Sequence, residues 1–151
     1  MKAIETEIDI RAEGSVVWDV LTDFPRYAEW NPFIPSASGD VRRGGRLRIR
    51  IAPVGLRHAT FRPRIVTLQP GRELSWVGRV LLPGVFDGWH SFRLAETGSG
   101  VRFYQCERFT GLFSAFFGED DIAAVRAGFE AMNTALRDRC EAMVAERRKA
   151  A

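Results

Sequence analysis

The chain has few of the residues on which metal, redox and disulfide chemistry depend. Its 151 residues include only two cysteines and two histidines. Cys106 and Cys140 stand alone, without a CxxC or Cys–His spacing. Zinc sites and disulfide frameworks are recognised by such spacings. The sequence indicates neither, and we expect reduced thiols, no metal and no cofactor.

Long apolar segments are also lacking. No run approaches the roughly 20 residues that cross a bilayer, and the opening segment MKAIETEIDIR has no apolar signal core. Repeats, linkers and low-complexity tracts are missing as well. A chain of this length is typical of one domain. We therefore expect a single domain over residues 1–151, cytoplasmic and without stable membrane insertion.

Basic charge is present in moderate excess. The formal net charge is +3. Arg46, Arg48 and Arg50 alternate along one predicted strand, and Arg62 and Arg64 along the next. If these strands pair, the arginines form an outer basic patch that a nucleic acid could bind. Aromatic residues do not interleave with them, as a stacking platform requires, so we interpret the patch as a solvated face and expect no nucleic-acid partner.

Alternating apolar and polar residues predict strands along most of the chain. The expected strands cover residues 3–11, 46–52, 58–68 and 73–81 and both sides of a turn at Gly98–Ser99. Two short helices are expected after the first strand, one from Val16 to Thr22 capped by Ser15, and a helical turn from Pro25 to Trp30. Short turns between neighbouring strands imply an antiparallel meander.

Residues 120–147 predict a long amphipathic helix. Acidic residues open it and basic residues close it, as the helix macrodipole favours. Gly128 interrupts the helix, and either leaves space beneath it or permits close packing. The apolar stripe recurs at spacings of three and four and comprises Ile122, Val125, Phe129, Met132, Leu136, Cys140 and Met143.

The hairpin around Gly98 and Ser99 carries the main functional signal. If Thr97 faces Gly100, then His90 faces Glu107, and Phe92 and Gln105 share their side of the hairpin. A strand face that combines aromatic residues with a His–Glu pair indicates the wall of a cavity. The alternative is a partly exposed His–Glu pair at the end of the sheet.

Four segments resemble one known superfamily. GSVVWDVLTDFPRYAEWN (14–31), PGRELSW (70–76), GWHSFRL (88–94) and ERFTGL (107–112) are similar to motifs of the START-like SRPBCC superfamily. This group includes polyketide cyclases, aromatase/cyclases and lipid-transfer domains. The resemblance implies an α+β helix-grip fold, with a seven-stranded antiparallel sheet curved around a long C-terminal helix and two short helices after the first strand.

The resemblance also implies an apolar cavity between the concave sheet face and the long helix. Trp30, Asn31 and Pro32 would shape the loop near its mouth or simply pack the helix pair. The implied lining comprises Phe33, Ile49, Phe61, Ile65, Trp76, His90, Phe92, Gln105 and Glu107, with Phe129 and Met132 as the roof.

Three functions are compatible with this sequence. The first is a carrier or binding protein for an apolar or aromatic small molecule of lipid, polyketide or quinone type. The second is a cyclase- or dehydratase-like enzyme in which His90 moves a proton and Glu107 holds its tautomer. The third is a protein–protein module that binds a quinone or lipid for a partner. No other catalytic arrangement is evident, which favours the carrier.

Two connectors, Leu81–Phe86 and Gly111–Phe117, are unusually apolar. Connecting loops are normally polar and exposed. These segments therefore suggest a cavity gate, a homodimer contact or a transient membrane contact, or else a satellite core under the long helix.

Overall fold

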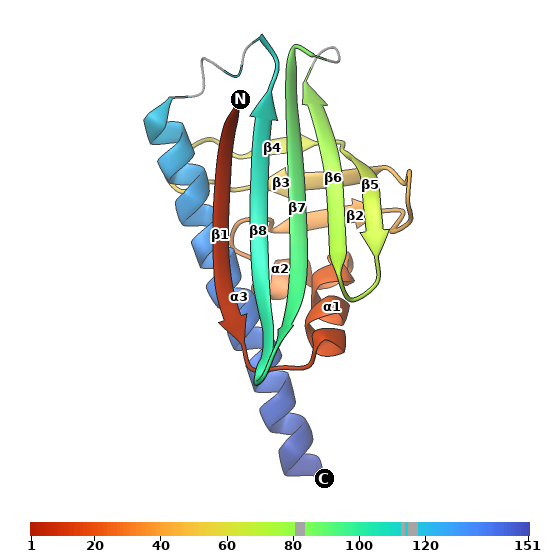
Figure 1. The fold of residues 1–151 in the computed structure, drawn as a ribbon. Helices are drawn as coiled ribbons and strands as arrows, with labels where there is room; N and C mark the ends of the chain where they lie inside the picture. The colour runs from red at the N-terminus through yellow and green to blue at the C-terminus, as the bar shows by residue number, and fades with distance from the viewer. Residues whose placement is uncertain (81–83, 113, 115–117) are drawn as a thin grey trace.

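The structure is a computed structural model that describes residues 1–80, 84–112, 114 and 118–151. A large antiparallel sheet forms one layer, and a small sheet and the helices lie behind it (Figure 1). The long C-terminal helix α3 (Glu119–Ala150) runs beside β1 (Lys2–Ile10) and extends past the end of the sheet. This is the expected α+β helix-grip arrangement.

The large sheet has the strand order β1-β8-β7-β6-β5. Its other strands are β5 (Arg64–Gln69), β6 (Glu73–Val80), β7 (Phe86–Thr97) and β8 (Gly100–Thr110). Every neighbouring pair is antiparallel, and Thr97 pairs with Gly100 as predicted. Gly71 adopts a positive φ of 72° at the turn after β5, as a type II turn requires at that position.

The second sheet is small and has the order β2-β3-β4. It consists of β2 (Ser36–Gly39), β3 (Leu47–Ile51) and β4 (Ala59–Phe61). The described residues thus form eight strands in two sheets, where the resemblance implied seven strands in one sheet. β2 escaped prediction because its sequence, SASG, lacks the apolar alternation of a half-buried strand.

Pro63 divides the strand that was predicted over residues 58–68. A proline has no N–H for a strand ladder, and here β4 ends before it and β5 begins after it. The Pro63 carbonyl instead accepts a hydrogen bond from Leu47 N at 2.9 Å. Ile65 N donates to Gly45 O at 2.9 Å. These bonds join the two sheets at a corner, so the chain turns from one sheet into the other.

The short helices differ from prediction at their start. Helix α1 spans Gly14–Thr22, so Ser15 lies inside the helix and the predicted Ser15 cap is wrong. Glu13 occupies the capping position in extended backbone, without a side-chain cap. A 3₁₀ turn η1 (Phe24–Arg26) and helix α2 (Tyr27–Trp30) follow, and the Tyr27 hydroxyl donates to the Leu21 carbonyl in the core.

Helix α3 buries the predicted stripe against the sheet. Val125, Phe129, Met132, Leu136 and Cys140 are buried, whereas Ile122 and Met143 are partly exposed at either end. Asp121 Oδ2 accepts from Gly118 N at 2.9 Å and closes the helix start. Gly128 serves close packing, because a Cβ placed there would lie 2.3 Å from Cδ2 of Phe33.

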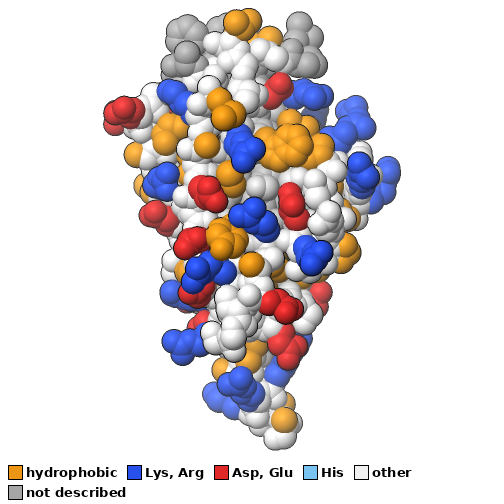
Figure 2. Space-filling view, in the orientation of Figure 1, with side chains coloured by type: hydrophobic (Ala, Val, Ile, Leu, Met, Phe, Trp, Pro, Cys, Tyr) orange, Lys and Arg blue, Asp and Glu red, His pale blue; other side chains and the backbone are white. Residues whose placement is uncertain are grey.

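The convex face of the large sheet carries acidic and basic side chains interspersed with isolated apolar ones (Figure 2). Arg102 and Asp9 form a bidentate pair there, at 2.7 and 3.1 Å. Trp89 is 44% exposed on the same face. This mixture is typical of a solvated sheet face. The predicted outer arginines Arg48 and Arg50 are exposed on β3.

Among the described residues, no helix is both long enough and apolar enough to span a bilayer. The connectors Leu81–Phe86 and Gly111–Phe117 were expected to offer a gate, a dimer contact or a membrane contact. Residues 81–83, 113 and 115–117 of these connectors lie outside the described residues.

Replacing Gly128 with alanine should destabilise the protein. Helix propensity alone favours alanine by about 1 kcal/mol, but the new methyl group would overlap the buried ring of Phe33. Overpacking of this kind costs about 1–3 kcal/mol, so the net effect in urea unfolding should be a loss. Thr134→Ala, at an exposed position of the same helix, is the control and should be neutral or stabilising. A Gly128→Ala protein more stable than wild type would contradict the packing.

The two thiols should differ in reactivity in the folded state. Burial raises the pKa of Cys140 to about 12, and it raises the pKa of the partly buried Cys106 as well. Because the thiolate is the reactive form, iodoacetamide at mildly alkaline pH should modify Cys106 slowly and Cys140 hardly at all. Peptide mass spectrometry would locate the label, and unfolding in urea should make both react. Rapid labelling of folded Cys140 would contradict the placement of α3.

Candidate functional site

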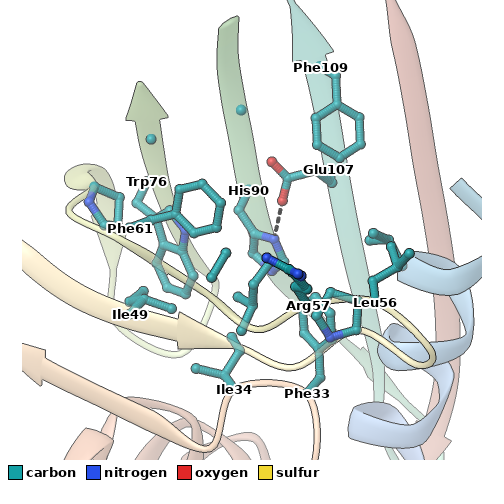
Figure 3. A pocket seen from close by; sticks show the side chains of 17 residues that line it. Phe33, Ile34, Ile49, Leu56, Arg57, Phe61, Trp76, His90, Glu107 and Phe109 are labelled. Atoms are coloured by element: carbon teal, nitrogen blue, oxygen red, sulfur yellow. Dashed lines mark hydrogen bonds and ion pairs between the residues drawn. The ribbon is translucent and has the colours of Figure 1, made fainter. Parts of the chain in front are cut away.

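A cavity of about 220 Å³ lies between the inner face of the large sheet and the small sheet (Figure 3). Val125 of α3 and the loop between β3 and β4, residues 52–58, complete its walls. Most of the lining is apolar. The lining residues are Phe33, Ile34, Ile49, Ile51, Pro53, Leu56, Arg57, Ala59, Phe61, Pro63, Trp76, Gly78, Gly88, His90, Glu107, Phe109 and Val125.

Strand register places the polar residues of this cavity. Trp76 pairs with His90, and His90 pairs with Glu107, so one row across β6, β7 and β8 faces inward. Side chains two residues apart along a strand share a face. The next row therefore consists of Gly78, Gly88 and Phe109, all of which also line the cavity.

His90 and Glu107 form a short hydrogen bond at this wall. His90 Nδ1 and Glu107 Oε2 are 2.5 Å apart, and the bond is visible in Figure 3. The side chains of His90 and Glu107 are 4% and 13% exposed. Because an ionised carboxylate only accepts, the histidine nitrogen donates. The predicted pairing is confirmed, and the pair faces the interior, not the solvent.

Aromatic rings fix the orientation of the imidazole. The Trp76 ring stacks on His90 with a centroid distance of 5.0 Å and an interplanar angle of 11°. Phe92 and Phe129 approach the imidazole edge-on, at 4.6 and 5.2 Å. Packed rings of this kind leave little room for rotation, so His90 holds one orientation toward Glu107.

The second nitrogen of His90 also has a protein partner. Gln105 Nε2 lies 3.3 Å from His90 Nε2 and 3.5 Å from the sulfur of Met132. With Nδ1–H directed to Glu107, Nε2 accepts from this amide. Both ring nitrogens are therefore engaged within the protein. Gln105 Oε1 is buried without a partner.

Asn31 positions the loop that supplies Phe33 and Ile34. Its side-chain oxygen accepts from Phe33 N at 3.1 Å and from Ile34 N at 2.8 Å. Ala52 N donates to the Phe33 carbonyl at 2.8 Å and ties this loop to the end of β3. Asn31 itself is not part of the lining, so its role is to hold the wall in place.

The residues expected in the cavity fall into two groups. Six line it: Phe33, Ile49, Phe61, Trp76, His90 and Glu107. The other five are buried in the packed core beside it: Ile65, Phe92, Gln105, Phe129 and Met132. Gln105 and Phe129 nevertheless contact His90. The second group thus supports the polar pair instead of facing the cavity.

Several lining residues were not anticipated from the sequence. Ile51 and Ala59 follow the alternation of Ile49 and Phe61 and could have been found by it. Arg57 comes from the loop after β3, where no periodic signal exists, and points toward the polar pair in Figure 3. Arg57 has no ion-pair partner within the described residues. It adds a cation to a mostly apolar wall that also holds the His90–Glu107 pair.

Within the described part of the chain, no group of three or more His, Cys, Asp or Glu side chains could hold a metal ion. Among the residues that line the cavity, the ionisable groups are one imidazole, one carboxylate and one guanidinium. These groups can bind, orient and exchange protons with a small molecule.

Similarity to solved structures extends over nearly the whole chain. The Zhui aromatase/cyclase from Streptomyces sp. R1128 has a TM-score of 0.75 at 19% identity, with 95% of each chain covered. Protein NE0264 from Nitrosomonas europaea has a TM-score of 0.72 at 18% identity, covering 95% of this chain and 96% of that one. The di-domain aromatase/cyclase StfQ from the steffimycin biosynthetic pathway has a TM-score of 0.72 at 14% identity, covering 95% of this chain and 52% of StfQ. These likenesses show the fold.

No curated protein matches this sequence significantly. A family profile does match, over residues 1–141, and that family is described as polyketide cyclase / dehydrase and lipid transport. The match covers most of the chain and agrees with the resemblance of the four sequence segments. The chain belongs to the polyketide cyclase/dehydrase and lipid transport family.

Proposed function

We propose that this protein binds an apolar, ring-containing small molecule in the cavity, as a carrier or binding protein. The observation that carries the proposal is the composition of the lining: aliphatic and aromatic side chains surround a single buried His–Glu pair. Ligand sites typically combine apolar walls with a few polar groups that set orientation. The family description, which joins polyketide cyclases with lipid transport, supports this class of ligand.

The size of the cavity favours a compact ligand. Its volume of about 220 Å³ lies below the roughly 300–1,000 Å³ of pockets for drug-sized molecules. A molecule of about one or two rings suits that volume better than an extended chain. Val54 and Leu56, on the loop between β3 and β4, are 59% and 38% exposed. Movement of this loop would enlarge the cavity for a longer ligand.

The polar pair itself favours a carrier over an acid–base enzyme. A histidine that shuttles protons needs a nitrogen free to reach the ligand. Both nitrogens of His90 are instead engaged, by Glu107 and by Gln105. The pair therefore supports binding and orientation more directly than proton transfer through His90.

Ligand binding should be saturable and should depend on the cavity. N-phenyl-1-naphthylamine, an uncharged dye that fluoresces in apolar surroundings, is the probe. Ala59→Phe fills the cavity from β4 and should weaken dye binding by at least about tenfold, which is about 1.4 kcal/mol. Fluorescence titration measures the change.

Thr60→Phe is the matched control, because Thr60 is exposed and its side chain points away from the cavity. The control should bind dye like wild type. If both variants bind equally well, the dye sits elsewhere and the cavity is not its site. Absence of saturable binding to wild type would contradict the proposed function.

An acid–base enzyme is the second candidate, and a specific observation keeps it open. Glu107 lines the cavity, and a carboxylate in apolar surroundings is an effective general base. Its hydrogen bond from His90 would fix its position. In that case a cyclase- or dehydratase-like reaction would use Glu107 and His90 as one unit.

Base activity can be tested without the natural substrate. Wild-type protein should open 5-nitrobenzisoxazole, a flat bicyclic probe that loses one proton, about 10² times faster than Glu107→Gln if the pair is a competent base. Release of the nitrophenolate product is followed by absorbance. Glu96→Gln, at an exposed position of β7, controls for loss of a carboxylate. Equal rates for wild type and Glu107→Gln would leave the carrier as the better explanation.

A further inference from the structure

The carboxylate oxygen of Glu107 that His90 does not bind is a hydrogen-bond acceptor at the cavity wall. Glu107 Oε2 is bound to His90, and His90 Nε2 faces Gln105. Among the hydrogen bonds of the described residues, the one at the Glu107 carboxylate is made by Oε2 and leaves Oε1 without a partner. His90 therefore holds the Glu107 carboxylate in position, and Oε1 of that carboxylate can accept a hydrogen bond from a ligand.

Gly88 creates the space that this oxygen occupies. A Cβ built on Gly88 would lie 2.8 Å from Glu107 Oε1, which is too close for any larger residue unless the carboxylate moves. Gly88 precedes His90 by two residues on β7 and shares its inward face. The glycine thus fixes where Oε1 lies relative to the cavity.

A second glycine extends this bare region of the wall. Gly78 pairs directly with Gly88 across β6 and β7, and both line the cavity. A Cβ built on Gly78 would meet only Pro63 Cβ, at 3.9 Å. On the inner face of the large sheet, two adjacent positions therefore have no side chain, and they lie immediately beside Glu107 Oε1. We call this region the glycine floor.

A flat ring is the shape that such a floor accommodates. Glycine is used where another group must approach the backbone closely. An ionised carboxylate at the edge of the floor can only accept a hydrogen bond. The matching ligand therefore carries a hydroxyl donor in the plane of its ring.

We propose that the cavity binds a planar ring with a phenol or enol hydroxyl, which lies on the Gly78–Gly88 floor and donates to Glu107 Oε1. Gly88 is then a specificity-determining position, Gly78 leaves room for the ring, and His90 is a positioning residue that acts through Glu107. This inference rests on the proposed function and goes beyond it by naming the chemical group that the site recognises.

Two probes with the same ring system distinguish the contribution of the hydroxyl donor from that of the ring. 2-Naphthol carries the hydroxyl, and 2-methoxynaphthalene lacks the donor. Their affinities are measured at neutral pH by competition against N-phenyl-1-naphthylamine. Wild type should prefer 2-naphthol by about tenfold or more, because hydrogen bonds to charged groups are the stronger ones. Gly88→Ala displaces the carboxylate and should reduce this preference below about threefold.

Gly78→Ala is the matched control on the same floor. Its methyl group occupies ring space without touching Glu107. It should weaken both probes by a similar factor and leave the preference intact. If circular dichroism shows that Gly88→Ala does not fold, Glu107→Gln replaces it, since it keeps the shape and removes the charge, and it too should lose the preference.

Two variants of His90 test its positioning role. The quantity compared is the ratio of the affinities for 2-naphthol and 2-methoxynaphthalene, because a loss of affinity for both probes could come from a change in packing. His90→Asn retains an N–H donor close to Nδ1 and should keep the preference for 2-naphthol. His90→Leu lacks that donor and should lose it. A preference that survives in His90→Leu would contradict the positioning role.

The outcomes distinguish this inference from the proposed function. Saturable dye binding with no preference for 2-naphthol in wild type would overturn the inference and leave the proposed function standing. A preference that persists in both Gly88→Ala and Glu107→Gln would overturn it as well. Failure of wild type to bind dye or either naphthalene probe would overturn both.

Discussion

The pairing of β7 with β8 is the constraint on which the rest of the site depends. Its register puts His90 opposite Glu107, and the parity of the strands then decides which neighbours face inward. A slip of one residue would turn the whole row of Trp76, His90 and Glu107 toward solvent. The short hydrogen bond between the pair and the tight packing around the imidazole are consequences of this register, and they in turn make it costly to change.

The cavity lies beside Glu107 and the glycine floor, where α3 contributes Val125 to the lining. Deeper in the fold, Phe129 packs against His90 and the sulfur of Met132 meets the Gln105 amide, and close packing of Gly128 on Phe33 brings the helix near. Toward the other end, Val125 is the α3 residue that lines the cavity. The division between core and cavity is therefore set by where large side chains of the helix meet the sheet.

The two members of the pair lie in different surroundings, and this difference supports the roles that we propose for them. In the enzyme alternative that the sequence left open, His90 moved a proton and Glu107 held its tautomer. In the structure, the imidazole is enclosed by rings and bonded at both nitrogens, whereas Glu107 keeps an oxygen at the cavity wall. This inversion supports our view that recognition of a ligand runs through the carboxylate. A small apolar site with one such acceptor suits a binding protein, and it would serve an acid–base enzyme by the same geometry.

The sequence by itself determined the alternating strands, the stripe of α3 and the hairpin register, because each follows from local periodicity and a short turn. It therefore placed His90 and Glu107 on one face, and the family resemblance added Trp76 to the same wall. Only the tertiary structure decided that the chain breaks at Pro63 to form a second sheet, that Ile65, Phe92 and Gln105 pack in the core, and that Arg57 and Gly88 reach the cavity. Alternation predicts which face of a strand a side chain occupies. What covers that face depends on α3 and on the loop between β3 and β4, which are distant in sequence. Their side-chain volumes and hydrogen bonds do not follow from any local pattern.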